Sequence, residues 1–238
     1  MRPSLVFSVE HAGHEVPPSC APLFASPERQ QVLRSHRGWD AGAAEVGRAW
    51  AALHGQTARC QPISRLVCDA NRSEDHPRVH APWLDALGEQ DRQALITTYH
   101  RPHREAVARE CAAALADGPV LHLAVHSFVP ELEGRRRPMQ VGLLYDPRRP
   151  AELSLCRAWR RELARLAAIR VDRNRPYRGW TDGLCTTLRA RFASAPYSGV
   201  EVELNQGWLP SVAADRVATW LDASLRRALL DAPGAQPS

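Results

Sequence analysis

The stretch that decides the fold is Ser4-Leu5-Val6-Phe7-Ser8-Val9, which runs directly into Glu10-His11-Ala12-Gly13-His14. Its first part is short, apolar and rich in β-branched and aromatic residues, which is typical of a buried strand. Val120-Leu121-His122-Leu123-Ala124-Val125 has the same character and runs directly into His126-Ser127. In open α/β sheets the binding crevice lies outside the carboxyl ends of the strands. We therefore expect both histidine motifs to meet at that edge of the sheet.

Further strand-like and helical segments alternate along the chain, which predicts a three-layer α/β/α fold with a mixed, mostly parallel sheet. Proline at position 102 should kink or break one long helix, because it lacks a backbone N–H. We expect a single domain over residues 1–230 and a loose polar tail over residues 231–238. The remaining predicted strands are Ala58–Ile63, Gln140–Leu144, Ala168–Asp172 and Val200–Leu204, and the predicted helices are Asp40–Leu53, Glu89–Asp117, Ala151–Ala167 and Ala213–Leu230.

The composition argues against several classes of function. The net charge of +5 comes from scattered arginines, since the chain contains no lysine, and only Arg135-Arg136-Arg137 forms a run. A nucleic-acid-binding protein needs a coherent basic stripe, so we expect no nucleic-acid partner. No apolar stretch approaches the length of a membrane span, and the six cysteines show no C-x-x-C pair. The first residues lack a basic region followed by a long apolar run, so we expect no signal peptide. We therefore expect no membrane association and a reduced, cytoplasmic location.

Three histidines form a candidate metal site. His11 and His14 lie on one tight turn, and His126 comes from a distant strand. Three protein ligands that leave a fourth position open for water are the arrangement of a catalytic zinc site. We expect one Zn²⁺ ion, although iron, cobalt and manganese also bind sites of histidine and carboxylate.

The alternating stretch Val200-Glu201-Val202-Glu203-Leu204-Asn205 carries a candidate general base. In a strand, Glu201 and Glu203 point to the same face. Two buried carboxylates on one face are costly unless they are used or paired, so one of them is expected to accept a proton during hydrolysis. We favour Glu203. The alternative is an edge strand with a solvated acidic face.

A carboxylate-binding pair is predicted at Asp69-x-Asn71-Arg72. The planar guanidinium of Arg72 offers two donors that match a carboxylate, and the amide of Asn71 lies beside it. Asp69 could orient Arg72 or a ligand histidine, and the alternative is a local salt bridge in a loop. In the turn after Asn174, Tyr177 could hydrogen-bond a substrate or a tetrahedral intermediate, or be an ordinary turn tyrosine.

Taken in order, the motifs resemble the N-formylglutamate amidohydrolase family over residues 4 to about 207. They are Glu10-His11-Ala12-Gly13-His14-Glu15-Val16-Pro17, Trp39-Asp40-Ala41-Gly42, Ser64-Arg65 to Asp69-x-Asn71-Arg72, Tyr99-His100-x-Pro102-His103, His126-Ser127, Asn174-x-Pro176-Tyr177-x-Gly179, and Glu201-x-Glu203-Leu204-Asn205.

The resemblance implies a fold like that of the zinc carboxypeptidases. Such enzymes use a histidine at one strand end with a second ligand shortly after it, which here is His14 or Glu15, and a third ligand from a His-Ser pair. It also implies that an Asn-Arg pair holds the substrate carboxylate and that a late glutamate is the base. Carried onto this chain, these roles fall on His11, His126, Asn71-Arg72 and Glu203.

We therefore expect hydrolysis of the amide bond of a small N-acyl amino acid with a free carboxylate, with N-formylglutamate giving formate and glutamate. Arg65 or Tyr177 would stabilise the developing oxyanion, and Asn174 would contact the substrate. The alternatives are a metallo-carboxypeptidase or amidase acting on another N-acylated or peptide substrate, and a non-catalytic metal-binding module. The sequence does not define the acyl group, the amino-acid side chain or the oligomeric state.

Overall fold

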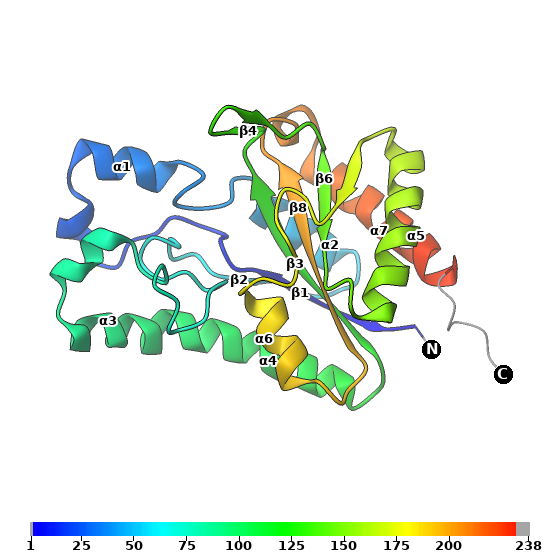
Figure 1. The fold of residues 1–238 in the computed structure, drawn as a ribbon, viewed down its shortest axis with the longest axis horizontal. Helices are drawn as coiled ribbons and strands as arrows, with labels where there is room; N and C mark the ends of the chain where they lie inside the picture. The colour runs from blue at the N-terminus through cyan, green and yellow to red at the C-terminus, as the bar shows by residue number, and fades with distance from the viewer. Residues whose placement is uncertain (1, 232–238) are drawn as a thin grey trace.

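A computed structural model describes residues 2–231 and contains a six-stranded central sheet (Figure 1). The strand order is β2-β1-β3-β8-β6-β7. All neighbouring pairs are parallel except β6 and β8, so the predicted mixed, mostly parallel sheet is confirmed. The strands of this sheet are β1 (Ser4–Val9), β2 (Arg59–Cys60), β3 (Val120–Phe128), β6 (Val141–Leu144), β7 (Val171–Arg173) and β8 (Tyr197–Asn205).

Helices cover both faces of the sheet, which confirms the three-layer α/β/α class (Figure 1). One face packs against α2 (Ala43–Ala52), α5 (Pro150–Ala167) and α7 (Ala214–Asp231). The other face packs against α4 (Arg101–Leu115) and α6 (Leu184–Arg191). The remaining elements are α1 (Pro27–Arg34), α3 (Glu89–Leu95), the hairpin of β4 (Glu131–Leu132) and β5 (Arg135–Arg136), and short turns at Ala21–Phe24, Pro82–Ala86, Ile96–His100 and Leu209–Ser211.

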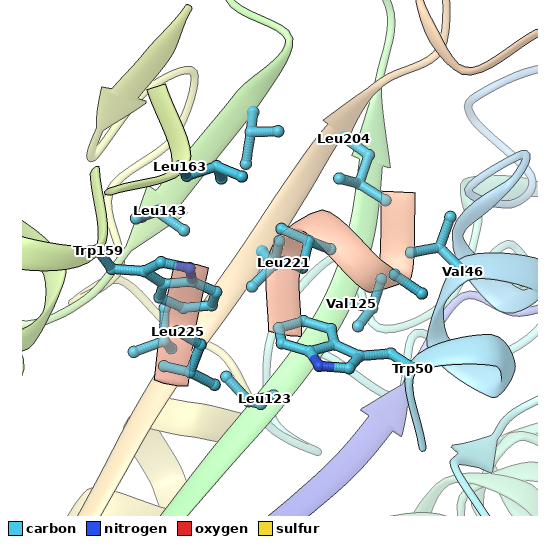
Figure 2. Close-up of a cluster of buried hydrophobic side chains, with 14 of the residues drawn as sticks. Val46, Trp50, Leu123, Val125, Leu143, Trp159, Leu163, Leu204, Leu221 and Leu225 are labelled. Carbon is cyan, nitrogen blue, oxygen red and sulfur yellow. The ribbon is translucent and has the colours of Figure 1, made fainter. Parts of the chain in front are cut away.

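The main hydrophobic core lies between the sheet and the layer of α2, α5 and α7. Figure 2 shows Leu123 and Val125 of β3 pointing into this core with Trp50 of α2 and Leu221 of α7, all buried. Side chains alternate along a strand, so these core positions leave the intervening residues of β3 on the opposite face. That opposite face carries the polar side chains of the site.

Strand β8 is an interior strand, which excludes the alternative of a solvated edge. In the register between β3 and β8, Glu203 lies opposite His126 and Glu201 lies opposite Ala124. The two glutamates and the histidine therefore share the face that α4 and α6 cover.

The long helical segment predicted over residues 89–117 is interrupted. Its middle forms a π-helical turn over Ile96–His100, and α4 then begins with Pro102 in its first turn. Proline has no N–H to donate, and it follows directly on the π turn, where the N–H of Arg101 donates to the carbonyl of Ile96. The predicted break is therefore correct.

Other segments differ from the predictions. Helix α2 begins at Ala43, after Gly42 in the left-handed region (φ 82°), and not at Asp40 as predicted. The helices α1 and α6 and the β4–β5 hairpin were not predicted. The tail expected at residues 231–238 lies outside the described residues, except for Asp231, which ends α7. Among the described helices, none has the length and apolar character needed to cross a membrane.

Candidate active site

A cavity of about 230 Å³ lies at the carboxyl ends of β1, β3 and β8. Each strand or the loop after it contributes polar side chains, as the crevice rule for α/β sheets predicts. The cavity is lined by His11, His36, Asp40, Arg65, Asn71, Arg72, His126, Ser127, Phe128, Val129, Tyr177, Arg178, Thr181, Asp182, Glu201 and Glu203. Most of the side chains proposed from the sequence are therefore brought to one place.

His11, Asp40 and His126 form a compact group that could hold a metal ion. Nδ1 of His11 lies 3.2 Å from Oδ2 of Asp40, and Nδ1 of His126 lies 3.0 Å from the same oxygen. All three side chains are buried, and the two imidazole rings meet edge to face with their centroids 5.1 Å apart. Two imidazole nitrogens and one carboxylate oxygen thus converge on one point.

Asp40 reaches the group because the loop before α2 is hydrogen-bonded to the chain at the carboxyl ends of both β1 and β3. Its backbone N–H donates to the carbonyl of His11 (3.0 Å), and its carboxylate accepts from the N–H of Ser127 (3.2 Å). The left-handed Gly42 then turns the chain into α2. The motif Trp39-Asp40-Ala41-Gly42 could have pointed to this side chain, but Asp40 was assigned to the start of a predicted helix and given no role in the site.

The structure does not bring His14 or the alternative Glu15 into this group. Gly13 packs so closely on the carbonyl of Pro62 that a Cβ would lie 2.5 Å from it, and the N–H of Glu15 donates to the same carbonyl (3.0 Å). The chain is thereby drawn away from the cavity along Pro62, and both side chains are exposed. The His14 ring lies 5.0 Å from that of Trp39 instead, and Asp40 occupies the place expected for His14.

A carboxylate lies behind each imidazole of the group. Nε2 of His11 is 2.7 Å from Oδ1 of Asp69, whose other oxygen accepts from Nε (3.2 Å) and Nη2 (2.9 Å) of Arg65. Nε2 of His126 is 2.9 Å from Oε2 of the fully buried Glu10. These contacts leave the Nδ1 atoms of both histidines directed at Asp40. The predicted alternative that Asp69 orients a ligand histidine matches this geometry.

The charges of the group stabilise one another. Burial alone would raise the pKa of Asp40 and of Asp69, but the neighbouring His11, with Arg65 beside Asp69, holds both pKa values well below the ordinary range. Burial alone would lower the pKa of His126, but its contacts with Asp40 and Glu10 raise it well above the ordinary value. The site thus strongly attracts positive charge.

Glu203 and Glu201 face the same cavity and are 5% and 8% exposed. Burial, reinforced by the negative charges of Asp40 and Glu201, raises the pKa of Glu203 to about 8. Burial also raises the pKa of Glu201. Carboxyl groups with raised pKa values are suited to exchanging protons near neutral pH.

The π-helical turn Ile96–His100 and helix α4 together hold the Asn71-Arg72 loop. The carbonyl of Arg72 accepts from Nε2 of His100 (2.8 Å) and from Nη1 of Arg104 (2.9 Å). The side-chain oxygen of Asn71 accepts from the N–H of Leu184 at the start of α6 (2.7 Å), so its amide NH₂ is the group left for a ligand. Both predicted carboxylate-binding residues line the cavity.

The remaining predicted residues differ in position. Tyr177 and Arg65 line the cavity, and the Tyr177 hydroxyl accepts from Nη1 of Arg137 (3.1 Å). Asn174 does not line it. Its side-chain oxygen accepts from the N–H groups of Tyr145 (3.0 Å) and Gly179 (3.1 Å), so this residue shapes the loop that carries Tyr177. The structure therefore places Asn174 outside the cavity, where its side-chain oxygen holds the loop.

The layered sheet and the histidine and carboxylate side chains at its strand ends define an α/β enzyme of hydrolase type. The chain belongs to the N-formylglutamate amidohydrolase family, whose family model matches residues 3–209. The resemblance inferred from the motifs is thus confirmed.

Two solved structures are similar to the chain. A gene product of Agrobacterium tumefaciens aligns with a TM-score of 0.79 and 27% identity over 97% of this chain and 92% of its own. N-formylglutamate amidohydrolase from Ralstonia eutropha aligns with a TM-score of 0.64 and 22% identity over 96% and 92%, and supports the fold. No curated protein matches the sequence significantly.

Proposed function

We propose that this protein is a zinc-dependent amidohydrolase that cleaves the amide bond of an N-acyl amino acid, with N-formylglutamate as the substrate giving formate and glutamate. The observation that carries the proposal is the convergence of His11, Asp40 and His126 with two buried glutamates in one cavity. Membership of the family supports the amide as the bond that is cleaved.

The residues present fit a zinc ion. His11, Asp40 and His126 would hold it, since imidazole nitrogen and carboxylate oxygen are both zinc ligands and three protein ligands are usual in catalytic sites. Ligand histidines in proteins generally place their second ring nitrogen against a carboxylate or carbonyl, and both histidines do so here. When bound, zinc would supply Lewis acidity toward the amide carbonyl and toward water.

The side chains around the group have distinct tasks in this proposal. Glu203 takes a proton from the attacking water and delivers it to the leaving amine. Its position opposite His126 in the sheet, beside the metal group, supports this role. Glu201 is the alternative base on the same face. Tyr177 hydrogen-bonds the oxyanion, and Arg65 contributes positive charge while it remains paired with Asp69.

Arg72 and Asn71 bind the carboxylate of the substrate. The Arg72 side chain makes no hydrogen bond to another described residue, so its two-pronged donor edge is available in the cavity. Arg178 lines the same cavity and adds a second positive charge. A site with two such groups suits a substrate with two carboxylates, as N-formylglutamate has.

One paired experiment tests this proposal. Purified protein is analysed for bound metals and assayed for formate release from N-formylglutamate, before and after treatment with a chelator and with zinc added back. We expect activity that is lost with the chelator and restored by zinc, and no activity in His126→Ala. Full activity of the chelator-treated protein or of His126→Ala would contradict the proposal.

A substrate panel distinguishes the alternatives. N-acetylglutamate, N-formylaspartate, N-formyl amino acids with apolar side chains and short peptides compare the acyl group and the side chain. We expect N-formylglutamate to give the highest kcat/KM. Faster cleavage of a peptide would favour the carboxypeptidase alternative, and metal binding without hydrolysis of any member would favour the non-catalytic one.

A further inference from the structure

Glu10 is an ionisable side chain with an unusual environment. It is fully buried, and neither carboxylate oxygen has an aligned hydrogen-bond donor among residues 2–231. Its Oε2 lies 2.9 Å from Nε2 of His126 and its Oε1 lies 3.7 Å from Nε2 of His103, and neither imidazole nitrogen has an aligned partner of its own. Four buried polar atoms without aligned partners thus face one another directly behind His126.

Another buried glutamate of the chain, Glu152, has hydrogen-bond donors for both of its carboxylate oxygens. Glu152 is also 0% exposed, yet its oxygens accept from the N–H groups of Asp146 (2.9 Å) and Gly199 (3.1 Å) and from Nε of Arg189 (2.9 Å). Burying an ionised carboxylate without such donors costs several kcal/mol. Glu10 therefore is poorly explained as a residue that stabilises the fold.

The two histidines of the metal group are supported in different ways. The carboxylate behind His11 is Asp69, which also accepts from Arg65 and from the N–H of Asn71 (3.0 Å). The carboxylate behind His126 is Glu10, and no guanidinium or backbone N–H of the described chain donates to it. The second group beside Glu10 is the imidazole of His103.

The position of His103 follows from the interrupted helix. The π-helical turn at Ile96–His100 precedes α4, and π turns in helices often occur at functional sites. His100 and His103 are both buried; Nε2 of His100 contacts the carbonyl of Arg72 (2.8 Å), and Nε2 of His103 lies 3.7 Å from Oε1 of Glu10. One helical segment thus supports both the substrate-binding loop and the carboxylate behind His126.

We propose that Glu10 and His103 are positioning residues for the metal ligand His126. Glu10 accepts from Nε2–H of His126 and so keeps Nδ1 free and directed at the metal, and His103 holds the Glu10 carboxylate from the opposite side. This inference rests on the proposed function, since it assigns these residues to the metal group. A residue that orients a ligand histidine typically contributes about 10- to 100-fold to metal affinity.

The test measures metal affinity and not only activity. Metal-stripped wild-type protein, Glu10→Gln, His103→Leu and His103→Gln are titrated with Zn²⁺ in competition with a chromophoric chelator. We expect Glu10→Gln to bind Zn²⁺ roughly 10- to 100-fold more weakly. His103→Leu should bind roughly 3- to 10-fold more weakly, as expected for the loss of a hydrogen bond, and His103→Gln should recover most of that loss because its amide can still donate.

A matched control is available on the same strand. His122 lies on the same face of β3 as His126 and is also fully buried, but it contacts Ser8 and Tyr197 instead of a carboxylate. His122→Gln should therefore keep the wild-type Zn²⁺ affinity. An equal loss of affinity in this control would overturn the proposal, because the effect would then come from general loosening of the core.

The absorption spectrum of bound Co²⁺ separates positioning from direct ligation. If Glu10 acts through His126, the Co²⁺ bands of Glu10→Gln keep the wild-type shape. Changed bands would overturn the proposal in favour of Glu10 as a ligand, and an unchanged Zn²⁺ affinity would overturn it altogether. If Glu10→Gln does not fold, the Zn²⁺ affinities of His103→Leu and His103→Gln test the proposal instead. A wild-type Zn²⁺ affinity in His103→Leu would then refute it. Wild-type protein that binds no divalent ion would refute the proposed function itself.

Discussion

Replacing Glu203 by glutamine should make the metal-free protein more stable and the enzyme inactive. The glutamine keeps the shape of the side chain but cannot ionise. Burial raises the pKa of Glu203 from 4.5 to about 8. At about 1.4 kcal/mol per pKa unit, ionising this group inside the folded protein costs on the order of 5 kcal/mol.

The sign of the pH dependence follows from which state binds the proton. Below about pH 4.5 Glu203 is protonated in both the folded and the unfolded chain, so it has no net effect. As the pH rises toward about 8, the unfolded chain loses the proton while the folded protein keeps it, and the free energy of unfolding falls. Glu203→Gln has no carboxyl group to titrate here, so its free energy of unfolding should exceed that of the wild type by an amount that grows from about pH 4.5 to about pH 8.

The assay is urea unfolding of chelator-treated protein, followed by tryptophan fluorescence between about pH 5 and pH 9. The difference between variant and wild type isolates Glu203 from all other titrating groups. In the metal-loaded enzyme, kcat of the variant should fall by roughly 10²- to 10⁴-fold, as expected for loss of a general base. Glu201→Gln is the comparison, and a larger loss of kcat there would transfer the role of the base to Glu201.

Two results would refute this reasoning. The first is a Glu203→Gln protein that is less stable than wild type near pH 8 and has the same pH dependence. It would mean that the Glu203 carboxylate is paired and charged in the folded protein. The second is a variant that retains kcat, which would remove Glu203 from the reaction.

Asp40→Asn should weaken Zn²⁺ binding by more than the roughly 10- to 100-fold loss of affinity expected when a residue that only orients a ligand is replaced, whereas His14→Ala should leave the affinity unchanged. Competition with a chelator measures both affinities. A larger loss of affinity in His14→Ala than in Asp40→Asn would restore His14 as a ligand. Arg72→Met should lower kcat/KM for N-formylglutamate by about 10- to 100-fold, mostly through KM, since a charged hydrogen bond is worth about 1.5 to 3 kcal/mol; an equal loss for an uncharged N-formyl amide would argue against carboxylate recognition. Burial lowers the pKa of His122 to about 4, so its contribution to stability is present above about pH 6.5 and is lost as the pH falls toward 4. His122→Gln should therefore show a shallower loss of stability in acid during urea unfolding, and a parallel loss would contradict that role.

The sequence predicted well those parts of the site that depend on strand periodicity. Alternation along β8 placed Glu201 and Glu203 on one face, and the apolar runs of β1 and β3 placed His11 and His126 at strand ends. These features are local, because two-residue periodicity fixes the face of each side chain within a single strand.

The missing parts of the site depend on contacts between distant segments. Asp40 became a member of the group because its loop packs against both β1 and β3, which no local pattern indicates. His14 was directed away by the close approach of Gly13 to Pro62, a contact between the loops after β1 and β2. The role proposed for Glu10 depends on helix α4, which places His103 beside the Glu10 carboxylate, and this contact could not be predicted from the sequence around Glu10.

The metal group also joins parts of the chain that are far apart in sequence. Asp40 is 29 positions from His11 and 86 positions from His126, yet one carboxylate oxygen contacts both rings. An ion bound there would tie the end of β1, the entrance of α2 and the end of β3 into a single cross-link that forms only in the folded protein. At a free concentration of about 1,000 times its Kd, such an ion adds about 4 kcal/mol to stability. Resistance to proteolysis would then report how fully a preparation is loaded, without any substrate being needed.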